Sequence, residues 1–212
     1  MRSGLYAIID VDSLTRARRE PCSFAERVLA AGALTALQLR AKSLGARDAL
    51  PLARRLAEIC HGAGVPFFVN DRPDLALLSG ARGVHVGTED LPVAEVRRFA
   101  PSLLVGTSTH TDADVSAALA TDADYVAFGP IFSTISKTDH APVTGLEGLR
   151  SAASRCASAG RSLVAIGGIT LENAAQIRAS GATSGAVISA LLVEEARVTD
   201  NARALHLALG GA

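Results

Sequence analysis

The sequence predicts an α/β protein in which eight strand–helix units close into one barrel. Short apolar runs alternate with segments of helical periodicity along the whole chain. Strands that are joined by helices pair in parallel through right-handed crossovers. Eight such units can be counted, and neither a linker nor a change of composition marks a second domain. We therefore expect a single (β/α)8 TIM-barrel domain over residues 1–212.

The strands are predicted where Val, Ile, Leu or Phe gather, because a strand buried on both faces is apolar throughout. They lie at residues 5–9, 36–39, 67–69, 84–86, 103–105, 125–128, 163–166 and 185–188. The helices are predicted from apolar residues at helical spacing. They lie at residues 24–31, 47–63, 73–78, 93–99, 113–120, 146–158, 171–179 and 199–207.

The composition argues against several classes of partner. The chain has 21 Lys and Arg residues and 21 Asp and Glu residues, so its formal net charge is zero. This charge balance gives no reason to expect binding to nucleic acid or to a membrane surface. No apolar run approaches the roughly 18 residues of a membrane span, and the N-terminus lacks the features of a signal peptide. The cysteines Cys22, Cys60 and Cys156 are widely spaced and indicate reduced thiols. We expect a cytoplasmic protein that acts on small molecules, and the sequence leaves a homo-oligomer open.

Polar residues gather where the predicted strands end, which is where a barrel of this class carries its chemistry. After the second strand, Gln38, Arg40 and Lys42 alternate with apolar residues and so share one face, toward the mouth of the barrel. Two buried cations without partners would be costly, and an anionic ligand would relieve them. The alternative is that both cations pair with carboxylates of the barrel.

Carboxylates follow the third and fourth strands. Asp71 stands at the end of the third strand beside Asn70, and Asp90 follows the fourth. Oxygen ligands on neighbouring loops suit magnesium, which binds one or two carboxylates together with substrate phosphates and water. The alternative is that Asp90 caps a helix, as we expect for Asp74.

Hydroxyl-rich loops are predicted after the fifth and sixth strands. The first holds Ser108 and His110, and His110 is either an acid–base residue or a structural one. The second spans residues 129–145 and holds Thr134, Ser136 and Lys137. One cation among hydroxyls suits phosphate binding, and a loop of this length suits a lid over the reacting groups.

The last two strands predict a site for a phosphate monoester. Gly167, Gly168 and Ser189 follow the seventh and eighth strands, where this fold commonly binds phosphate; the alternative for the glycines is a tight turn. On the other side, Arg40, Lys42 and Lys137 stand against Asp71 and Asp90. With a magnesium ion, this leaves a surplus of roughly three positive charges, which matches a diphosphate. We expect two phosphorylated ligands, or one ligand with two phosphorylated ends.

Five segments together resemble the thiamine-phosphate synthase family in order and spacing, from Leu5 to about Leu192. They are Gln38-Leu39-Arg40-Ala41-Lys42, Val69-Asn70-Asp71, residues 83–90, residues 129–132 with 134–137, and Ile166-Gly167-Gly168-Ile169. The resemblance implies a reaction between hydroxymethylpyrimidine diphosphate and a thiazole phosphate that yields thiamine phosphate. It implies that the pyrimidine ionises first and that the thiazole nitrogen then attacks the cation.

The resemblance also implies a role for each candidate residue. Magnesium is held by Asp71 and Asp90. The pyrimidine and its diphosphate are surrounded by Gln38, Arg40, Lys42, Asn70 and Ser108, and Lys137 binds the departing diphosphate. The thiazole phosphate is contacted by Thr134, Ser136, Gly167 or Gly168, and Ser189. Lys137, Ser108 and Arg40 are the residues expected to act in catalysis.

Three other functions remain as alternatives. An aminothiazole tautomerase of the same superfamily would use the phosphate site without diphosphate or magnesium, and His110 would be its acid–base residue. A sugar-phosphate isomerase would require an acid–base pair that the sequence does not place. A thiamine-phosphate binding protein without catalytic activity would bind the product but would not turn over.

Overall fold

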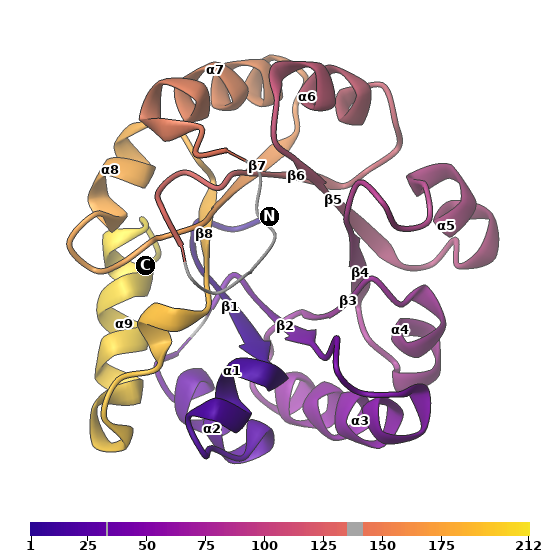
Figure 1. Ribbon diagram of the computed structural model, residues 1–212, viewed down its shortest axis with the longest axis vertical. Coiled ribbons are helices and arrows are strands. Elements are labelled where there is room, and N and C mark those ends of the chain that lie inside the picture. The colour runs from indigo at the N-terminus through magenta and orange to yellow at the C-terminus, as the bar shows by residue number, and fades with distance from the viewer. Residues whose placement is uncertain (33, 135–141) are drawn as a thin grey trace.

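The computed structural model describes residues 1–32, 34–134 and 142–212. Eight parallel strands pair in chain order, and the last pairs with the first, so the sheet closes into a barrel. The helices surround the barrel on the outside (Figure 1). The predicted (β/α)8 TIM barrel is therefore confirmed.

The strands lie close to their predicted positions. They are β1 (Gly4–Asp10), β2 (Ala36–Arg40), β3 (Phe67–Asn70), β4 (Gly83–Val86), β5 (Leu104–Thr109), β6 (Tyr125–Phe128), β7 (Ser162–Ile166) and β8 (Ser184–Val187). The largest difference is at β5, which continues through Ser108 and Thr109 instead of ending at Val105. These polar residues pair with β6 and extend the barrel wall, so Ser108 belongs to a strand and not to a loop.

The helices follow in the expected alternation. They are α1 (Val11–Arg16), α2 (Pro21–Leu29), α3 (Ala46–Gly62), α4 (Pro73–Ser79), α5 (Val93–Phe99), α6 (Asp112–Leu119), α7 (Gly145–Ser158), α8 (Ala174–Ala179) and α9 (Val198–Ala208), with 3-10 turns η1 (Ser189–Leu191) and η2 (Glu195–Arg197). Within the described ranges, no helix combines the length and apolar character that crossing a membrane requires.

The helix α1 was not predicted, and α2 begins earlier than expected. The Asp10 carboxylate accepts a hydrogen bond from the Ser13 N–H and thereby starts α1 directly at the end of β1. The Glu20 carboxylate accepts from the Cys22 and Ser23 N–H groups, and Pro21 occupies the first turn of α2. Both starts are set by capping, which apolar periodicity does not detect.

The strands separate two apolar layers. One face of each strand packs under the helices in a large core. The other face fills the barrel interior, where the buried side chains are Tyr6, Ile8, Ala36, Phe68, Tyr125, Ala127, Val164 and Ala186. The three aromatic rings meet at centroid distances of 5.7 to 6.0 Å. They form a solid floor in the barrel, so a ligand has room only above it, where the strands end.

Candidate active site

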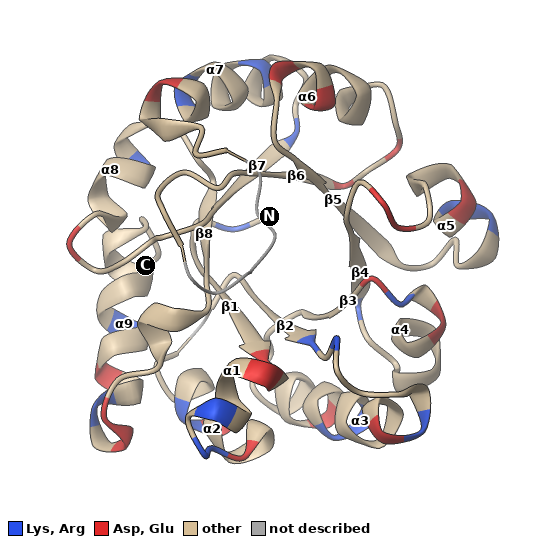
Figure 2. Cartoon of the chain, in the orientation of Figure 1, with Lys and Arg blue, Asp and Glu red and all other residues tan. Residues whose placement is uncertain are grey.

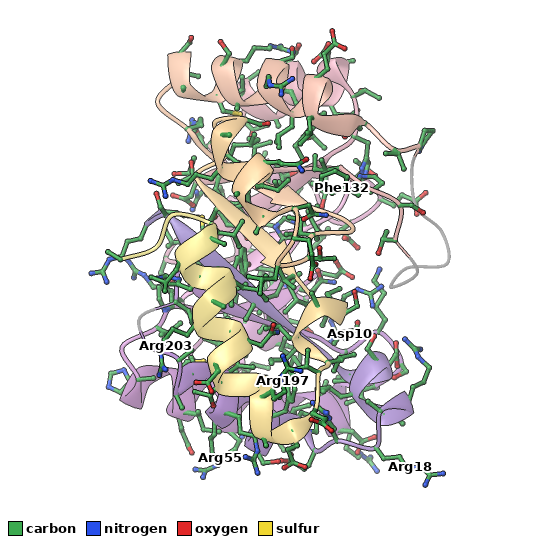
Figure 3. The ribbon with its side chains drawn as sticks, turned by 90° about the vertical axis from the view of Figure 1, so that its left-hand side faces the viewer. Asp10, Arg18, Arg55, Phe132, Arg197 and Arg203 are labelled. Atoms are coloured by element: carbon green, nitrogen blue, oxygen red, sulfur yellow. The ribbon has the colours of Figure 1, made fainter. Side chains whose placement is uncertain are left out.

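A cavity of about 1110 Å³ lies at the end of the barrel where the strands end. Asp10 at the end of β1 and Phe132 after β6 lie at this same end of the molecule (Figure 3). The sequence-predicted residues that line the cavity are Gln38, Arg40, Lys42, Asn70, Asp71, Asp90, Ser108, His110 and Ser189. The structure therefore brings together side chains from β2, β3, β5 and the loops after β2, β3, β4 and β8.

Both predicted cations of the second strand are paired with carboxylates. Arg40 Nη1 lies 2.5 Å from Asp10 Oδ2, and Lys42 Nζ lies 3.0 Å from Asp71 Oδ2. This is the arrangement that the sequence left as an alternative, so neither cation depends on a ligand for its partner. Charged residues of both signs lie around the ends of β1 and β2 in Figure 2.

Asp10 is a site residue that the sequence reasoning missed. Its side chain is 1% exposed, and its two oxygens serve different partners, the α1 N-terminus and Arg40. Asp10 thus fixes the Arg40 guanidinium at the wall of the cavity. The signal was available: Tyr6, Ile8 and Asp10 alternate along β1 and therefore share the interior face.

Asp71 and Asp90 are held close to one another. Burial and the adjoining Asp90 carboxylate raise the pKa of Asp71 above its ordinary value, while Lys42 opposes that shift. Asp71 has a φ of +64°, a left-handed conformation that a residue with a side chain adopts rarely and that often marks a functional position. Its N–H donates to the His85 carbonyl oxygen at 2.7 Å, which anchors this conformation.

Asp90 does not cap a helix. Its carboxylate accepts a hydrogen bond from the Gly87 N–H at 2.7 Å, and the N-cap of α5 is Pro92. The helix-capping alternative for Asp90 is therefore wrong. Asp74 lies in the first turn of α4 and pairs with Arg72 at 2.5 Å, while the N-cap itself is Arg72. Asp74 is not the N-cap residue, but its carboxylate accepts a hydrogen bond from the Leu75 N–H in this first turn, so it helps to cap α4 as expected.

The charge around the cavity differs from the predicted surplus. The described lining holds three basic residues against five acidic ones, a net charge of −2: Arg16, Arg40 and Lys42 against Asp10, Asp12, Asp71, Glu89 and Asp90. Adding Lys137 and a divalent cation gives about +1 in place of the predicted surplus of about three, by simple addition of unit charges. The difference arises because α1 and Asp10 were not placed at the mouth. Without a cation, this lining repels a diphosphate.

A chain of hydrogen bonds crosses the floor of the cavity. Gln38 Nε2 donates to the Tyr6 hydroxyl, which lies 2.9 Å from the Tyr125 hydroxyl. His85 Nδ1 lies 2.9 Å from the Tyr125 hydroxyl, and His85 Nε2 lies 2.9 Å from Ser108 Oγ. Both ring nitrogens of His85 are thus engaged inside the barrel. Burial raises the pKa of both tyrosines, so each keeps its hydroxyl proton.

Gly167 and Gly168 hold the loop after β6 against the loop after β7. Their φ angles are +100° and +64°, and a Cβ atom would approach Pro130 Cβ and the Ser133 carbonyl oxygen, respectively, to 2.5 Å. The Phe132 N–H donates to the Gly167 carbonyl oxygen at 3.1 Å. The glycines are thus required for a close approach of two loops, and a phosphate-binding role for them stays a prediction.

The predicted loop after β6 is only partly described. Thr134 is the last residue before the gap, whereas Ser136 and Lys137 lie outside the described residues, as do residues 135–141 of the proposed lid as a whole. The roles of Thr134, Ser136 and Lys137 therefore stay predictions.

His110 lies at the wall of the cavity with one ring nitrogen engaged. Nδ1–H donates to the Gly129 carbonyl oxygen at 2.5 Å, and the backbone N–H donates to the Asp114 carboxylate. This leaves Nε2 as the ring nitrogen for any acid–base role. The acid–base role of His110 stays a prediction.

The comparisons with known proteins agree with these features. The family model described as "Thiamine monophosphate synthase" matches residues 5–191. A thiamine-phosphate synthase of Methanoculleus marisnigri is 44% identical over 207 residues, 97% of this chain and 95% of that protein. One of Methanocella arvoryzae is 42% identical over 196 residues, 92% of this chain and 90% of that protein.

A solved structure agrees as well. The thiamine phosphate pyrophosphorylase from Pyrococcus furiosus superposes with a TM-score of 0.85 at 32% identity and covers 97% of this chain and 95% of that chain. The family model spans most of the chain, and both relatives exceed 40% identity over nearly the whole length. The chain belongs to the thiamine monophosphate synthase family.

Proposed function

We propose that this enzyme, a thiamine-phosphate synthase, joins hydroxymethylpyrimidine diphosphate to a thiazole phosphate by a dissociative reaction in the cavity above the barrel floor. The observation that carries the proposal is the charged half of the cavity, where Asp71 and Asp90 stand together beside the two ion pairs of Arg40 and Lys42. The thiazole is the plain hydroxyethylthiazole phosphate or its carboxylated form.

The reaction requires the bond between the pyrimidine methylene carbon and the diphosphate oxygen to break first, with the electron pair leaving on the diphosphate. The thiazole nitrogen then supplies its lone pair to the methylene carbon and forms the new bond. With the plain thiazole phosphate, no proton is transferred in either step; the carboxylated form would also lose CO2 and take up one proton at the carbon that carried the carboxylate. The enzyme must therefore stabilise leaving-group charge and exclude water, and it needs no nucleophile.

The acidic pair fits a magnesium ion. Both side chains offer oxygen ligands. Burial and the neighbouring Asp90 carboxylate raise the pKa of Asp71, and a divalent cation would offset both effects. Within the described residues, no cluster of three or more His, Cys, Asp or Glu could hold a metal. We therefore assign Asp71 and Asp90 as ligands beside phosphate oxygens and water. Magnesium, when bound, neutralises charge that develops on the leaving diphosphate.

Lys42 and Arg40 differ in how freely their charged groups can move. Lys42 is 54% exposed and ends in a flexible chain, so its ammonium group can move from Asp71 to a phosphate oxygen once the metal occupies that carboxylate. Arg40 is held by Asp10, which fixes its guanidinium group at the wall of the cavity. We propose that Lys137 adds the third cation, and that Asn70 and Ser108 orient the pyrimidine. The thiazole phosphate would then bind Thr134, Ser136, Gly167, Gly168 and Ser189.

The cellular location and the partners of the enzyme are proposals as well. Cys22, Cys60 and Cys156 form no disulfide, which supports a cytoplasmic location. The proposed partners are the two small substrates, and a homo-oligomer remains open.

Turnover with both substrates tests the function. Purified enzyme, pyrimidine diphosphate, thiazole phosphate and magnesium should yield thiamine phosphate and diphosphate in equal amounts, because one bond forms for each bond broken. A folded protein that binds thiazole phosphate and releases no diphosphate would contradict the proposal. Such a result would favour the tautomerase and make His110, with its fixed Nδ1, the next residue to replace.

A further inference from the structure

The hydrogen-bond chain on the cavity floor joins two residues that are proposed to touch the pyrimidine. Gln38 lies at one end and Ser108 at the other, and Tyr6, Tyr125 and His85 connect them through four contacts of 2.9 Å. The three connecting residues are at most 8% exposed. A buried chain of this kind is stable only when each hydroxyl both donates and accepts correctly.

The Gln38 end sets the direction of the chain. Tyr6 accepts from the Gln38 amide, so its single hydroxyl proton is available for Tyr125. Tyr125 then accepts from Tyr6 and donates its own proton to His85 Nδ1. The remaining proton of a neutral His85 ring is on Nε2, which donates to Ser108 Oγ.

Ser108 therefore accepts from the floor of the cavity, and its hydroxyl proton is directed to a ligand. At the other end of the chain, Gln38 lines the cavity and uses its amide nitrogen as the donor to Tyr6, so its amide oxygen is the atom that can accept from a ligand.

The packing of Tyr125 keeps this chain in place. A Cβ atom at Gly106 would lie 2.0 Å from Tyr125 Cζ and 2.4 Å from its hydroxyl oxygen, so glycine leaves the room that the ring occupies. The ring stacks on His85 at 5.5 Å and meets the edge of Phe68 at 5.7 Å. The hydroxyl of Tyr125 therefore has little freedom to turn to another partner.

We propose that Tyr125 and His85 are positioning residues that hold Ser108 as a donor and Gln38 as an acceptor, and so select a 4-aminopyrimidine over its 4-oxo analogue. The proposal rests on the function proposed above. An aminopyrimidine offers an amino N–H to an acceptor and a ring nitrogen to a donor. The oxo analogue offers a carbonyl oxygen and a ring N–H, which reverses both contacts, and a site that is built for one pattern rejects the other strongly.

The test compares the two pyrimidine diphosphates as substrates. We would measure kcat and KM for the 4-amino and the 4-oxo compound with thiazole phosphate and magnesium saturating, and take the ratio of the two kcat/KM values. The variants are Tyr125→Phe, which removes one hydroxyl from the chain, and His85→Leu, which removes both ring nitrogens. His85→Gln is the conservative rescue, because its amide nitrogen can replace Nε2 as the donor to Ser108. Phe68→Leu is the matched control, because it loosens the same rings without removing a hydrogen bond.

The expected result is a change in selectivity more than in rate. Wild type should favour the amino compound by about a hundredfold or more. Tyr125→Phe and His85→Leu should lower that ratio by about tenfold or more, mainly through KM, because Ser108 is then free to turn its proton toward the floor. His85→Gln and Phe68→Leu should keep the ratio within about threefold, and thermal melting should confirm that each variant is folded.

Three results would overturn the proposal. The first is a wild type that makes thiamine phosphate without preferring the amino compound. The second is an unchanged ratio in Tyr125→Phe, and the third is a fall in Phe68→Leu as large as that in Tyr125→Phe, which would assign the effect to packing. Failure of the proposed function is distinguishable from all three, since wild type would then form no product from the amino compound.

Discussion

Replacement of Lys137 by alanine is expected to lower turnover by about a hundredfold or more, as when a main electrostatic stabiliser of a transition state is removed. The reason lies in the charge of the mouth. Arg40 and Lys42 are each engaged with a carboxylate, and the described lining carries a net charge of −2 from three basic and five acidic residues. A further cation therefore contributes strongly when a diphosphate departs. The measurement is steady-state turnover at saturating magnesium.

Two observations accompany that experiment. Lys137→Arg keeps the charge and should recover a large part of the lost rate, and thermal melting of Lys137→Ala should match that of wild type. An alanine variant with wild-type turnover would remove Lys137 from the mechanism.

Replacement of Asp90 by asparagine is expected to raise the magnesium concentration for half-maximal turnover by at least about tenfold, the lower end of the loss seen when even an outer-shell partner of a metal is changed. The amide keeps an oxygen that can accept from the Gly87 N–H, so the turn should survive. What is lost is one of two negative charges that face the metal. Turnover measured across a magnesium titration gives the shift directly.

Asp74→Asn is the matched control for this variant. Asp74 lies nearby in the first turn of α4, is 43% exposed and pairs with Arg72 at 2.5 Å, so its charge does not face the cavity floor. Its magnesium titration should match that of wild type. If Asp90→Asn also titrates as wild type does, Asp90 has only the structural role of holding Gly87.

The fold could be predicted from apolar runs, and the exceptions are segments that an apolar pattern does not mark. Seven strands were predicted within about two residues at each end, because strands buried on both faces are apolar throughout. The end of β5 was missed because Thr107, Ser108 and Thr109 are polar residues of the barrel wall. The helix α1 is too short for periodicity to indicate, and only the capping contact of Asp10 marks it.

The candidate site was predictable where it depends on position along a strand and not where it depends on closure of the barrel. Gln38, Arg40 and Lys42 were found from their alternation, and the structure places all three at the cavity. The partner of Arg40 lies 30 residues away and that of Gln38 lies 32 residues away, in β1. Tyr125 is 119 residues from Tyr6. Nothing in a local pattern joins residues at such separations.

The most direct test of the account is the binding of inorganic diphosphate to the purified enzyme, measured by calorimetry with magnesium and again with a chelator. The mouth as described has more acidic than basic residues, so a divalent cation at Asp71 and Asp90 is required to reverse the repulsion. The account predicts binding with magnesium and an affinity at least about a hundredfold lower with chelator, the size of effect that buried charges produce. Equal affinity in the two conditions would contradict it, because the acidic pair would then have no part in holding the leaving group.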